Sequence, residues 1–469
     1  MTARRHAGVM PGLARAAGKR ARAAAALMAA LATLTLLTAP ITAPAQTRPL
    51  GVATWNLAWL MSLETHARWA AACARHGWPT DPATLAPGAR RELEGLPYCS
   101  VHNGMRFPPQ ACAGDDEGWP QRARYRPGHP CRDTADLADP TAYRDKLDQL
   151  RRWFARLADE GVSVVALQEV FDDAAVLPLL PPGWSVRTSR GLPGSPDIAQ
   201  QLGVAWAPGL APGGFRAEPA LADSGPGLRP LRPGFAFTLP VDGRPVEFLV
   251  VHLKAGCRSR VIDDPLRPDD PPERRDAIAS DCAMLRRQLP ALEDWIDARA
   301  GRDFVVLGDF NRSLFLEPVK DRPDRPVRLD GSSPASPSGP CDLALVEGRL
   351  QARCPARTSA LFPELNDDDP PGSVLWRARP AELSGGRIRP GGPADCNLRG
   401  GQPPRRGAGD LAHDGIDHVL LSDALKRRLS PQALALRMLG HLDEAGRPFA
   451  ASPARALPSD HCPHWVVLD

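Results

Sequence analysis

Short apolar runs beside polar residues dominate the hydrophobic pattern of this chain. An uninterrupted apolar run of this length, bounded by turn residues, is typical of a buried strand. Each of the firmest runs begins or ends beside an acid, an amide or an imidazole. These runs lie at residues 50–57, 162–167, 246–251, 303–309, 415–422 and 464–469. Weaker strands are expected at residues 184–188, 202–206 and 235–239.

Helical periodicity occurs in two longer segments. Residues 141–160 repeat apolar side chains at helical spacing, and Gly161 follows as a terminating residue. Residues 273–299 also place their apolar side chains on one helix face, and a shorter helix is expected at 62–74. This alternation of strands and helices is compatible with a layered α/β class.

Two long segments interrupt this pattern, at about residues 61–140 and 320–412. Both are rich in proline, glycine and charged residues, and both contain several cysteines. We interpret them as loop-rich insertions into a single domain that covers residues 46–469. The first insertion would need disulfides, because a segment with so few apolar residues cannot build a core of its own. A separate small domain is the alternative for that segment.

The first 45 residues are predicted to form an export signal. A basic start precedes an apolar stretch at about residues 23–37, and Ala43-Pro44-Ala45 provides a small-x-small cleavage site. The apolar stretch is shorter than the roughly 20 residues that a membrane span needs, which favours cleavage before Gln46 over an uncleaved anchor. No later window is long and apolar enough to cross a bilayer. We therefore expect an exported protein, periplasmic or secreted, with no stable membrane insertion after signal removal.

Composition and net charge do not identify a nucleic-acid or protein partner. The chain is 43% hydrophobic and 24% charged, as in globular proteins. Its formal charge of +4 falls to about −2 without the six basic residues of the signal. A near-neutral chain has no broad electrostatic attraction to nucleic acid, although a nuclease with a local basic surface remains compatible with it. Nothing in the sequence indicates an obligate protein partner.

All ten cysteines lie beyond the export signal. An even number of cysteines in an exported chain favours disulfides, and the lack of any Cys-x-x-Cys pair argues against a structural zinc site. Cys282 lies on the predicted helix at 273–299, shortly after Cys257, and we predict that these two form a disulfide. Cys462 is left open between a buried thiol and a disulfide partner.

Polar residues at the strand ends form the candidate site, because strands that lie side by side bring their ends together. Taken singly, each such residue is more often a cap or a loop residue. Together, their carboxylates can bind Mg²⁺ or Mn²⁺, their amides can hold a phosphate, and their imidazoles can carry protons. Strand alternation puts Asp417 and His418 on opposite faces, so only one can face the site. The candidates are Asn56, Glu169, His252, Asp309, Asn311, Asp417, Asp460 and His461.

Six short motifs resemble, in order, the motif series of the endonuclease/exonuclease/phosphatase superfamily, whose members include deoxyribonuclease I-like enzymes. They are Trp-Asn at 55–56, Leu-Gln-Glu at 167–169, Val-His-Leu-Lys at 251–254, Gly-Asp-Phe-Asn at 308–311, Ile-Asp-His at 416–418 and Ser-Asp-His at 459–461. The resemblance spans about residues 50–469, apart from the two insertions. It implies a four-layer α-β-β-α sandwich of two mostly antiparallel sheets with outer helices, and a site at one end.

The resemblance also implies a metal site. Glu169 matches the main metal-binding carboxylate, and Asn56 lies beside it on the metal or the phosphate. Asp460 matches a further acid at the same metal. The expected ion is Mg²⁺ or Mn²⁺, with Ca²⁺ as a further possibility.

Five residues match the catalytic positions of the superfamily. Asp309 matches the acid that orients or deprotonates the attacking water, and Asn311 matches the amide that grips the phosphate. His461, oriented by Asp417, matches the histidine that stabilises the transition state. His252 matches a second histidine that contacts the phosphate or protonates the leaving oxygen.

These roles predict a metal-dependent phosphodiester hydrolase. The sequence His252-Leu253-Lys254, followed by a cysteine three residues later in an exported chain, is similar to secreted bacterial members taken as nucleases, so DNA or RNA is the expected substrate. A sphingomyelinase-like or other phospholipid phosphodiesterase, or a phosphatase, is the first alternative. A non-catalytic binding module on the same scaffold is the second, although all the residues that the motif series requires are present.

Overall fold

A computed structural model gives the structure of most of the chain beyond the expected signal. It describes residues 49–79, 85–99, 138–226, 228–257, 262, 265–266, 270–312, 314, 327–328, 342–346, 349–353, 361–366, 368–380, 416–439, 459 and 461–469. The expected export signal and large parts of both expected insertions lie outside these residues. None of the helices among them is long and apolar enough to cross a membrane.

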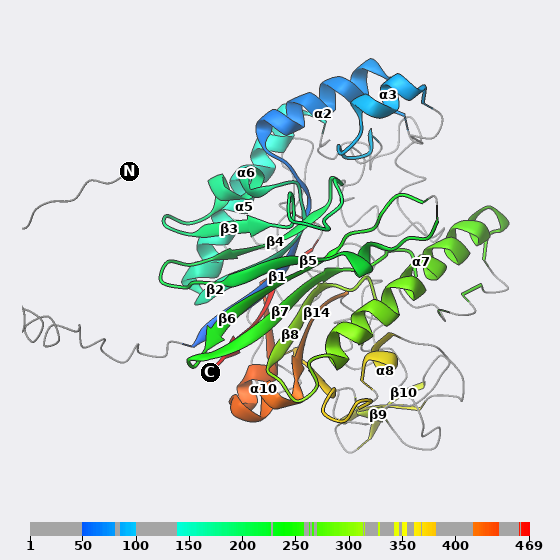
Figure 1. Ribbon diagram of the computed structural model, residues 1–469. Coiled ribbons are helices and arrows are strands. Elements are labelled where there is room, and N and C mark those ends of the chain that lie inside the picture. Colours follow the sequence, from blue (N-terminus) through cyan, green and yellow to red (C-terminus); the bar gives the residue numbers. More distant parts are fainter. Residues whose placement is uncertain are drawn as a thin grey trace, which may run out of the picture. The chain divides into compact units, whose positions relative to one another are not determined.

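Two mixed sheets pack face to face (Figure 1). The first has the described strand order β13 (Arg379–Pro380), β15 (Ala435–Met438), β16 (His464–Leu468), β1 (Leu50–Leu60), β2 (Val162–Val170), β4 (Gln201–Trp206), β3 (Ser185–Thr188). The second has the order β12 (Leu375–Arg377), β14 (Asp417–Ser422), β8 (Phe304–Asp309), β7 (Arg244–His252), β6 (Gly234–Val241), β5 (Gly213–Glu218). Most neighbouring strands are antiparallel, and the pairs β1–β2, β7–β8 and β13–β15 are parallel.

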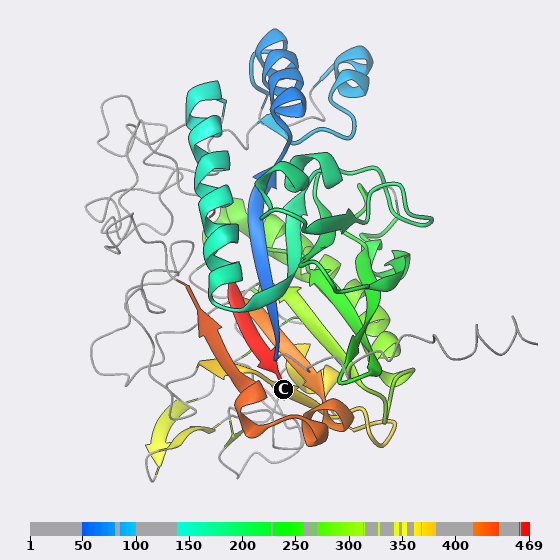
Figure 2. The ribbon, with the colours of Figure 1, turned by 90° about the vertical axis from the view of Figure 1, so that its left-hand side faces the viewer.

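Helices cover the outer faces of both sheets. The first sheet packs against α2 (Leu63–Arg75) and α5 (Pro140–Asp159), and the second against α7 (Pro272–Asp297) and α8 (Leu361–Leu365). Figure 2 shows α5 beside β1 and β16. This confirms the four-layer sandwich that the motif resemblance implied. The shorter elements are α3 (Pro87–Glu92), α6 (Asp173–Val176), η5 (Leu177–Leu179), η6 (Pro219–Ala222), α10 (Asp423–Arg428), η9 (Pro431–Leu434) and a small sheet of β9 (Val327–Arg328), β10 (Asp342–Val346) and β11 (Arg349–Arg353).

Alternation along β1 explains why one end of the sandwich is polar. Val52 belongs to the core between the sheets, whereas Ala53 and Trp55 pack against the helices. Because successive side chains of a strand point to opposite faces, Thr54 and Asn56 follow Val52 on the inner face. The inner face of β1 therefore changes from apolar to polar towards the C-terminal end of the strand.

The structure extends the elements expected from sequence and adds others. Strand β2 reaches Val170, beyond the expected run at 162–167. Strands β5 and β12 were not expected, because Gly213–Glu218 and Leu375–Arg377 do not form an apolar run. Helix α8 and strand β12 lie within residues 320–412, so this part of the expected second insertion contributes to the sandwich and its core.

Two disulfides have both cysteines among the described residues. The expected pair Cys257–Cys282 joins the segment after β7 to α7. A second disulfide, Cys73–Cys99, joins α2 to the segment that follows α3. Cys462 is also disulfide-bonded. Of the two alternatives left open for it, a buried thiol and a disulfide partner, the second is therefore correct.

Candidate active site

Three neighbouring strands of the second sheet carry polar side chains at the same level. His252 on β7 lies opposite Asp309 on β8, and Asp309 lies opposite Asp417 on β14. All three are buried. Each lies two residues along its strand from an apolar residue of the core between the sheets, namely Val250, Leu307 or Val419. The three side chains therefore face the first sheet together.

The first sheet supplies Asn56 and Glu169 from its central parallel strands. Asn56 lies opposite Gln168, so in a regular strand the next side chain, Glu169, would point away from the site. The pairing of β2 with β4 shifts between Leu167 and Val170, and Glu169 has a left-handed backbone with φ 56°. An irregularity of this kind redirects a side chain at a modest cost in strain, and here it brings the carboxylate to the site.

The side-chain amide of Asn56 connects the two sheets. Its Nδ2 donates hydrogen bonds to Glu169 Oε1 at 3.2 Å and to Asp309 Oδ2 at 3.0 Å, and its Oδ1 accepts one from Ala58 N at 2.9 Å. The backbone N–H of Trp59 donates to Glu169 Oε2 at 3.1 Å. In this orientation Asn56 holds the two carboxylates in place. Its own oxygen would have to turn away from Ala58 to bind a metal.

The C-terminal Ser-Asp-His motif is held against β1. Ser459 Oγ donates to the backbone oxygen of Asn56 at 2.6 Å and accepts from His461 N at 3.0 Å. The indole N–H of Trp55 donates to the His461 carbonyl at 2.9 Å. These bonds explain how a motif more than 400 residues away in sequence is positioned. Asp460 lies outside the described residues, and its metal role stays a prediction.

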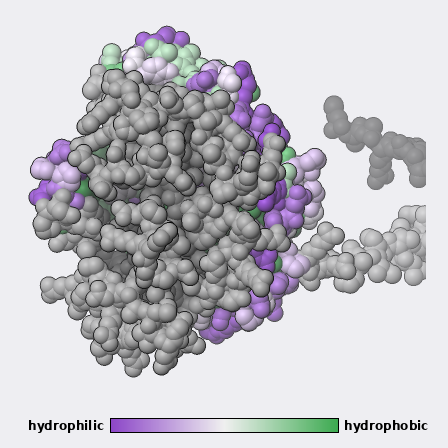
Figure 3. Space-filling view, turned by 180° about the vertical axis from the view of Figure 1, so that it is seen from behind, coloured by the Kyte–Doolittle hydropathy of each residue, from purple (hydrophilic) through white to green (hydrophobic). Residues whose placement is uncertain are grey.

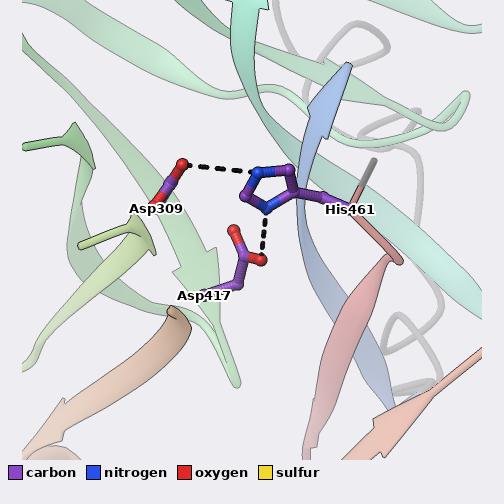
Figure 4. Close-up of side chains that lie close together, drawn as sticks. All are labelled: Asp309, Asp417 and His461. Atoms are coloured by element: carbon purple, nitrogen blue, oxygen red, sulfur yellow. Dashed lines mark hydrogen bonds and ion pairs between the residues drawn. The ribbon is translucent and has the colours of Figure 1, made fainter. Parts of the chain in front are cut away.

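His461 lies between two carboxylates (Figure 4). Its Nδ1 is 2.7 Å from Asp417 Oδ2, and its Nε2 is 3.7 Å from Asp309 Oδ2. A carboxylate on one ring nitrogen fixes which nitrogen the ring presents on its other side. Asp417 therefore directs the Nε2 of His461 towards Asp309.

His252 approaches the same carboxylates from the second sheet. Its Nε2 lies 3.5 Å from Asp309 Oδ2 and 3.7 Å from Glu169 Oε1. The guanidinium of Arg232 donates from Nε to the His252 carbonyl at 3.1 Å and also donates to the Leu253 carbonyl. Burial lowers the pKa of Arg232, and the charges of Glu169 and Asp309 oppose that shift. Sequence reasoning missed Arg232, because it follows a proline-rich loop in a chain where arginine is common.

Asp309 has an altered acidity. Burial raises the pKa of Asp309 from 3.8 to about 7, while the charge of His461 lowers it and the charge of Asp417 raises it. Hydrogen bonds from Asn311 and Asn56 also lower it. A carboxyl group with a pKa near neutrality can exchange a proton at physiological pH, as a general base must.

Asn311 and His418 have partners that define their orientation. Asn311 donates from its backbone N–H to Asp309 Oδ1 at 2.7 Å and from Nδ2 to the Leu253 carbonyl at 2.9 Å. His418 points to the outer face, where its Nε2 is 2.8 Å from the Arg312 carbonyl. Asp417 is therefore the member of the Asp-His pair that faces the site.

A buried lysine and tyrosine of α5 hold the irregular end of β1. Lys146 Nζ donates to the Leu57 carbonyl at 2.8 Å and to the Ala58 carbonyl. The Tyr143 hydroxyl accepts from Met61 N at 2.6 Å and donates to Met61 O at 2.8 Å, and burial raises the pKa of Tyr143. Lys146 was not identified from sequence, although it lies on the apolar face of the helix predicted at 141–160.

The donor set of this site fits a divalent cation. Ligand atoms from Asp309, Asp417 and His461 lie within 4.8 Å of one another and could hold a metal. Glu169 adds a further buried carboxylate, and Asp417 Oδ1 is buried without a hydrogen-bond partner among the described residues. Several buried carboxylates are costly without a compensating cation, and hard oxygen donors suit ions such as Mg²⁺.

A model of the Endonuclease/Exonuclease/phosphatase family matches residues 53–461. With this match over most of its length, the chain belongs to that family. Members of the family are generally hydrolases that act on phosphate esters. The sequence has no significant match among curated proteins.

Several solved structures resemble the chain at low identity. TDP2 from Caenorhabditis elegans is 12% identical, with 70% of this chain and 92% of that chain covered and a TM-score of 0.34. Sphingomyelinase C from Streptomyces griseocarneus is 14% identical, with 90% and 100% covered and a TM-score of 0.37. A mannosyl-6-phosphatase from Bacteroides thetaiotaomicron is 12% identical, with 72% and 96% covered and a TM-score of 0.31. At these TM-scores the likenesses carry no argument about substrate.

Proposed function

We propose that this protein is an exported, metal-dependent phosphodiester hydrolase that cleaves DNA or RNA. The observation that supports this most directly is the position of Asp309 between two imidazoles. Asp309 Oδ2 lies 3.5 Å from His252 Nε2 and 3.7 Å from His461 Nε2, and it also accepts a hydrogen bond from Asn56. A proton acceptor flanked by two proton carriers suits attack of water on a phosphodiester.

Each group near Asp309 has a proposed part in the reaction. Asp309 orients the attacking water and accepts its proton, which its pKa of about 7 allows near neutral pH. His461, held by Asp417, presents Nε2 to the charge that develops on the phosphoryl oxygens. His252 contacts the phosphate or protonates the leaving oxygen. Asn311 contributes polar groups beside the phosphate, as the resemblance implies.

The proposed metal ligands centre on Glu169, which is held by Asn56 and the Trp59 backbone N–H. Asn56, which lies between Glu169 and Asp309, and Asp460 are the further candidates for the metal. Mg²⁺ or Mn²⁺ is the proposed ion, and when bound it would neutralise charge on the phosphate. The Asn56 amide keeps both carboxylates turned towards the same point.

Export and a nucleic-acid substrate are the finer parts of the proposal. The disulfides of the described region are in keeping with an oxidising compartment, and residues 1–45 carry the features of a cleaved signal. The arrangement of His252, Lys254 and Cys257 is similar to secreted nucleases. A sphingomyelinase-like activity is the alternative, and a comparison of substrates distinguishes it from nucleic-acid cleavage.

The test uses purified protein from residue 46 onwards with supercoiled plasmid DNA, RNA, sphingomyelin vesicles and a phosphate monoester. Metal-dependent nicking of DNA or cleavage of RNA, stopped by EDTA, is expected. Asp309→Ala and His461→Ala should each lose the activity while retaining wild-type thermal unfolding within a few degrees. Full activity in these variants would contradict the mechanism, and phosphocholine release without nucleic-acid cleavage would contradict the substrate.

A further inference from the structure

We infer that a pocket beside the candidate active site binds a nucleotide unit next to the scissile phosphate. The inference rests on the proposed function, because it takes the substrate to be a nucleic acid. The pocket lies between residues 85–99 and two loops, at 196–198 and 229–230, and its volume is about 510 Å³. This is within the range of roughly 300–1,000 Å³ that is usual for small-molecule sites.

Segment 85–99 of this pocket is linked to α2 by a disulfide and lies close to the loop at 196–198. The Cys73–Cys99 disulfide joins the end of segment 85–99 to α2. Gly95 in the same segment lies against the neighbouring loop, because a Cβ atom at Gly95 would lie only 3.3 Å from Asp197 Oδ2. The pocket is therefore formed where part of the first insertion packs against loops of the sandwich.

The lining of the pocket is rich in arginine. It includes three arginines and two acids, and one of these acids, Asp197, forms an ion pair with Arg190 outside the lining. The arginines are Arg90, Arg91 and Arg229. Arg229 is exposed and forms no ion pair with a described residue, so its guanidinium can bind a phosphate. A surplus of cations matches the backbone of a nucleic acid and would repel the choline of a sphingolipid.

An exposed aromatic ring lies among these arginines. Tyr98 is 37% exposed, and the Arg229 guanidinium carbon lies 4.7 Å from the centroid of its ring. Unpaired bases stack on tyrosine rings and on guanidinium planes, and the same guanidinium can contact the adjacent phosphate. Seen from behind, hydrophobic residues gather at the end that carries α2 and α3, while the other described surface in this view is largely hydrophilic (Figure 3).

One residue connects the pocket to the catalytic carboxylates. The Trp59 ring centroid lies 6.4 Å from that of Tyr98, in an edge-on arrangement. The backbone N–H of Trp59 donates to Glu169 Oε2 at 3.1 Å. A nucleotide on Tyr98 and Arg229 would therefore lie close to Glu169, the carboxylate proposed to bind the metal. The aromatic and arginine pair is placed to determine which nucleic acids enter the site.

The test compares Tyr98→Ala, Tyr98→Phe and Arg229→Ala in otherwise full-length mature enzyme, with Arg244→Ala as the matched control. Arg244 is an exposed arginine at the start of β7, the opposite end of that strand from His252. Steady-state kinetics are measured on a labelled single-stranded oligonucleotide and on methyl p-nitrophenyl phosphate, which carries no base. Thermal unfolding is recorded for every variant.

Tyr98→Ala and Arg229→Ala should raise KM for the oligonucleotide about tenfold, as loss of one stacked base does, with kcat changed less than about twofold. The increase should exceed that for the small ester, and Tyr98→Phe should restore most of the affinity because its ring still stacks. Unchanged KM in an enzyme that cleaves the oligonucleotide would overturn the pocket assignment alone. An enzyme that hydrolyses the small ester and no nucleic acid would instead overturn the proposed function.

Discussion

Asp417 Oδ2 lies 2.7 Å from His461 Nδ1, and this contact joins the second sheet to the segment that leads into the last strand of the first. The two residues are 44 positions apart in sequence. On the other side of the ring, His461 Nε2 faces Asp309 at 3.7 Å. The proposed catalytic histidine is therefore oriented by a residue that it can meet only after both sheets have formed.

The first prediction concerns this pair. Asp417→Asn should lower kcat by about 100-fold or more, the scale of a lost acid–base or positioning group, because the His461 ring is then no longer held with Nε2 towards Asp309. KM should change little. The double variant Asp417→Asn/His461→Ala should be no slower than His461→Ala, since groups that act as a unit have non-additive effects. If the two decreases in kcat multiply in the double variant, Asp417 acts independently of His461.

The second prediction concerns metal binding without an activity measurement. Millimolar Mg²⁺ or Mn²⁺ should raise the Tm of the EDTA-treated protein, because a ligand that binds only the folded state adds about 2.7 kcal/mol at one hundred times its Kd. Glu169→Gln should remove most of this increase. Asp242→Asn, a change of an exposed acid in the turn after β6, is the matched control and should keep the increase. An undiminished shift in Glu169→Gln would remove Glu169 from the metal site.

The third prediction is a pH dependence of stability that originates at Asp309. Its pKa is about 7 in the folded protein and 3.8 ordinarily, so between these values the folded state holds a proton that the unfolded state has released. The contribution of Asp309 is therefore most favourable below about pH 4, falls as pH rises to 7, and is constant above. In EDTA, wild-type protein should lose stability relative to Asp309→Asn over this window. Urea denaturation at pH 5, 6, 7 and 8 measures the difference, and a difference that does not vary with pH would contradict the altered pKa.

The fourth prediction concerns the glycine before Asp309. Gly308 has φ 144°, and a Cβ atom there would lie 2.0 Å from the Val251 carbonyl oxygen of the neighbouring strand. Gly308→Ala should therefore separate β7 from β8, lower the unfolding free energy by more than about 2 kcal/mol and displace His252 from Asp309. Gly243→Ala is the control: its φ is 74°, but nothing lies within 4 Å of the added atom, so only the backbone penalty of about 1 kcal/mol is expected. An equal decrease in the free energy of unfolding in the two variants would show that the close approach of β7 and β8 is not the cause of the destabilisation.

Much of the sandwich could be predicted from local pattern. The runs at 162–167 and 246–251 are strands because their mostly apolar side chains are buried inside a layered fold. The strands β5 and β12 were not predicted, because they have no apolar run of their own and form by pairing with β6 and β14. The Cys257–Cys282 pair was predictable because the two cysteines are near in sequence and Cys282 lies on a predicted helix, whereas Cys73–Cys99 was not singled out.

The candidate site also has a part that the sequence predicts and a part that only the fold decides. Sequence by itself determined which acids, amides and imidazoles stand at the strand ends, because strand alternation and motif order are properties of the chain. Only the tertiary structure decided that Asn56 turns its NH₂ group to Glu169 and Asp309. It alone revealed Arg232 beside the carboxylates and Lys146 beneath β1.

The physical reason for this difference is the range, along the chain, of the interactions involved. Apolar periodicity relates residues only a few positions apart, so it can be recognised in the sequence. Hydrogen bonds and buried charges are satisfied by whichever group the packed sheets bring near. Lys146 meets Leu57 across 89 residues, and Ser459 meets Asn56 across 403. Those partners meet only once α5 and the segment before β16 have packed against β1.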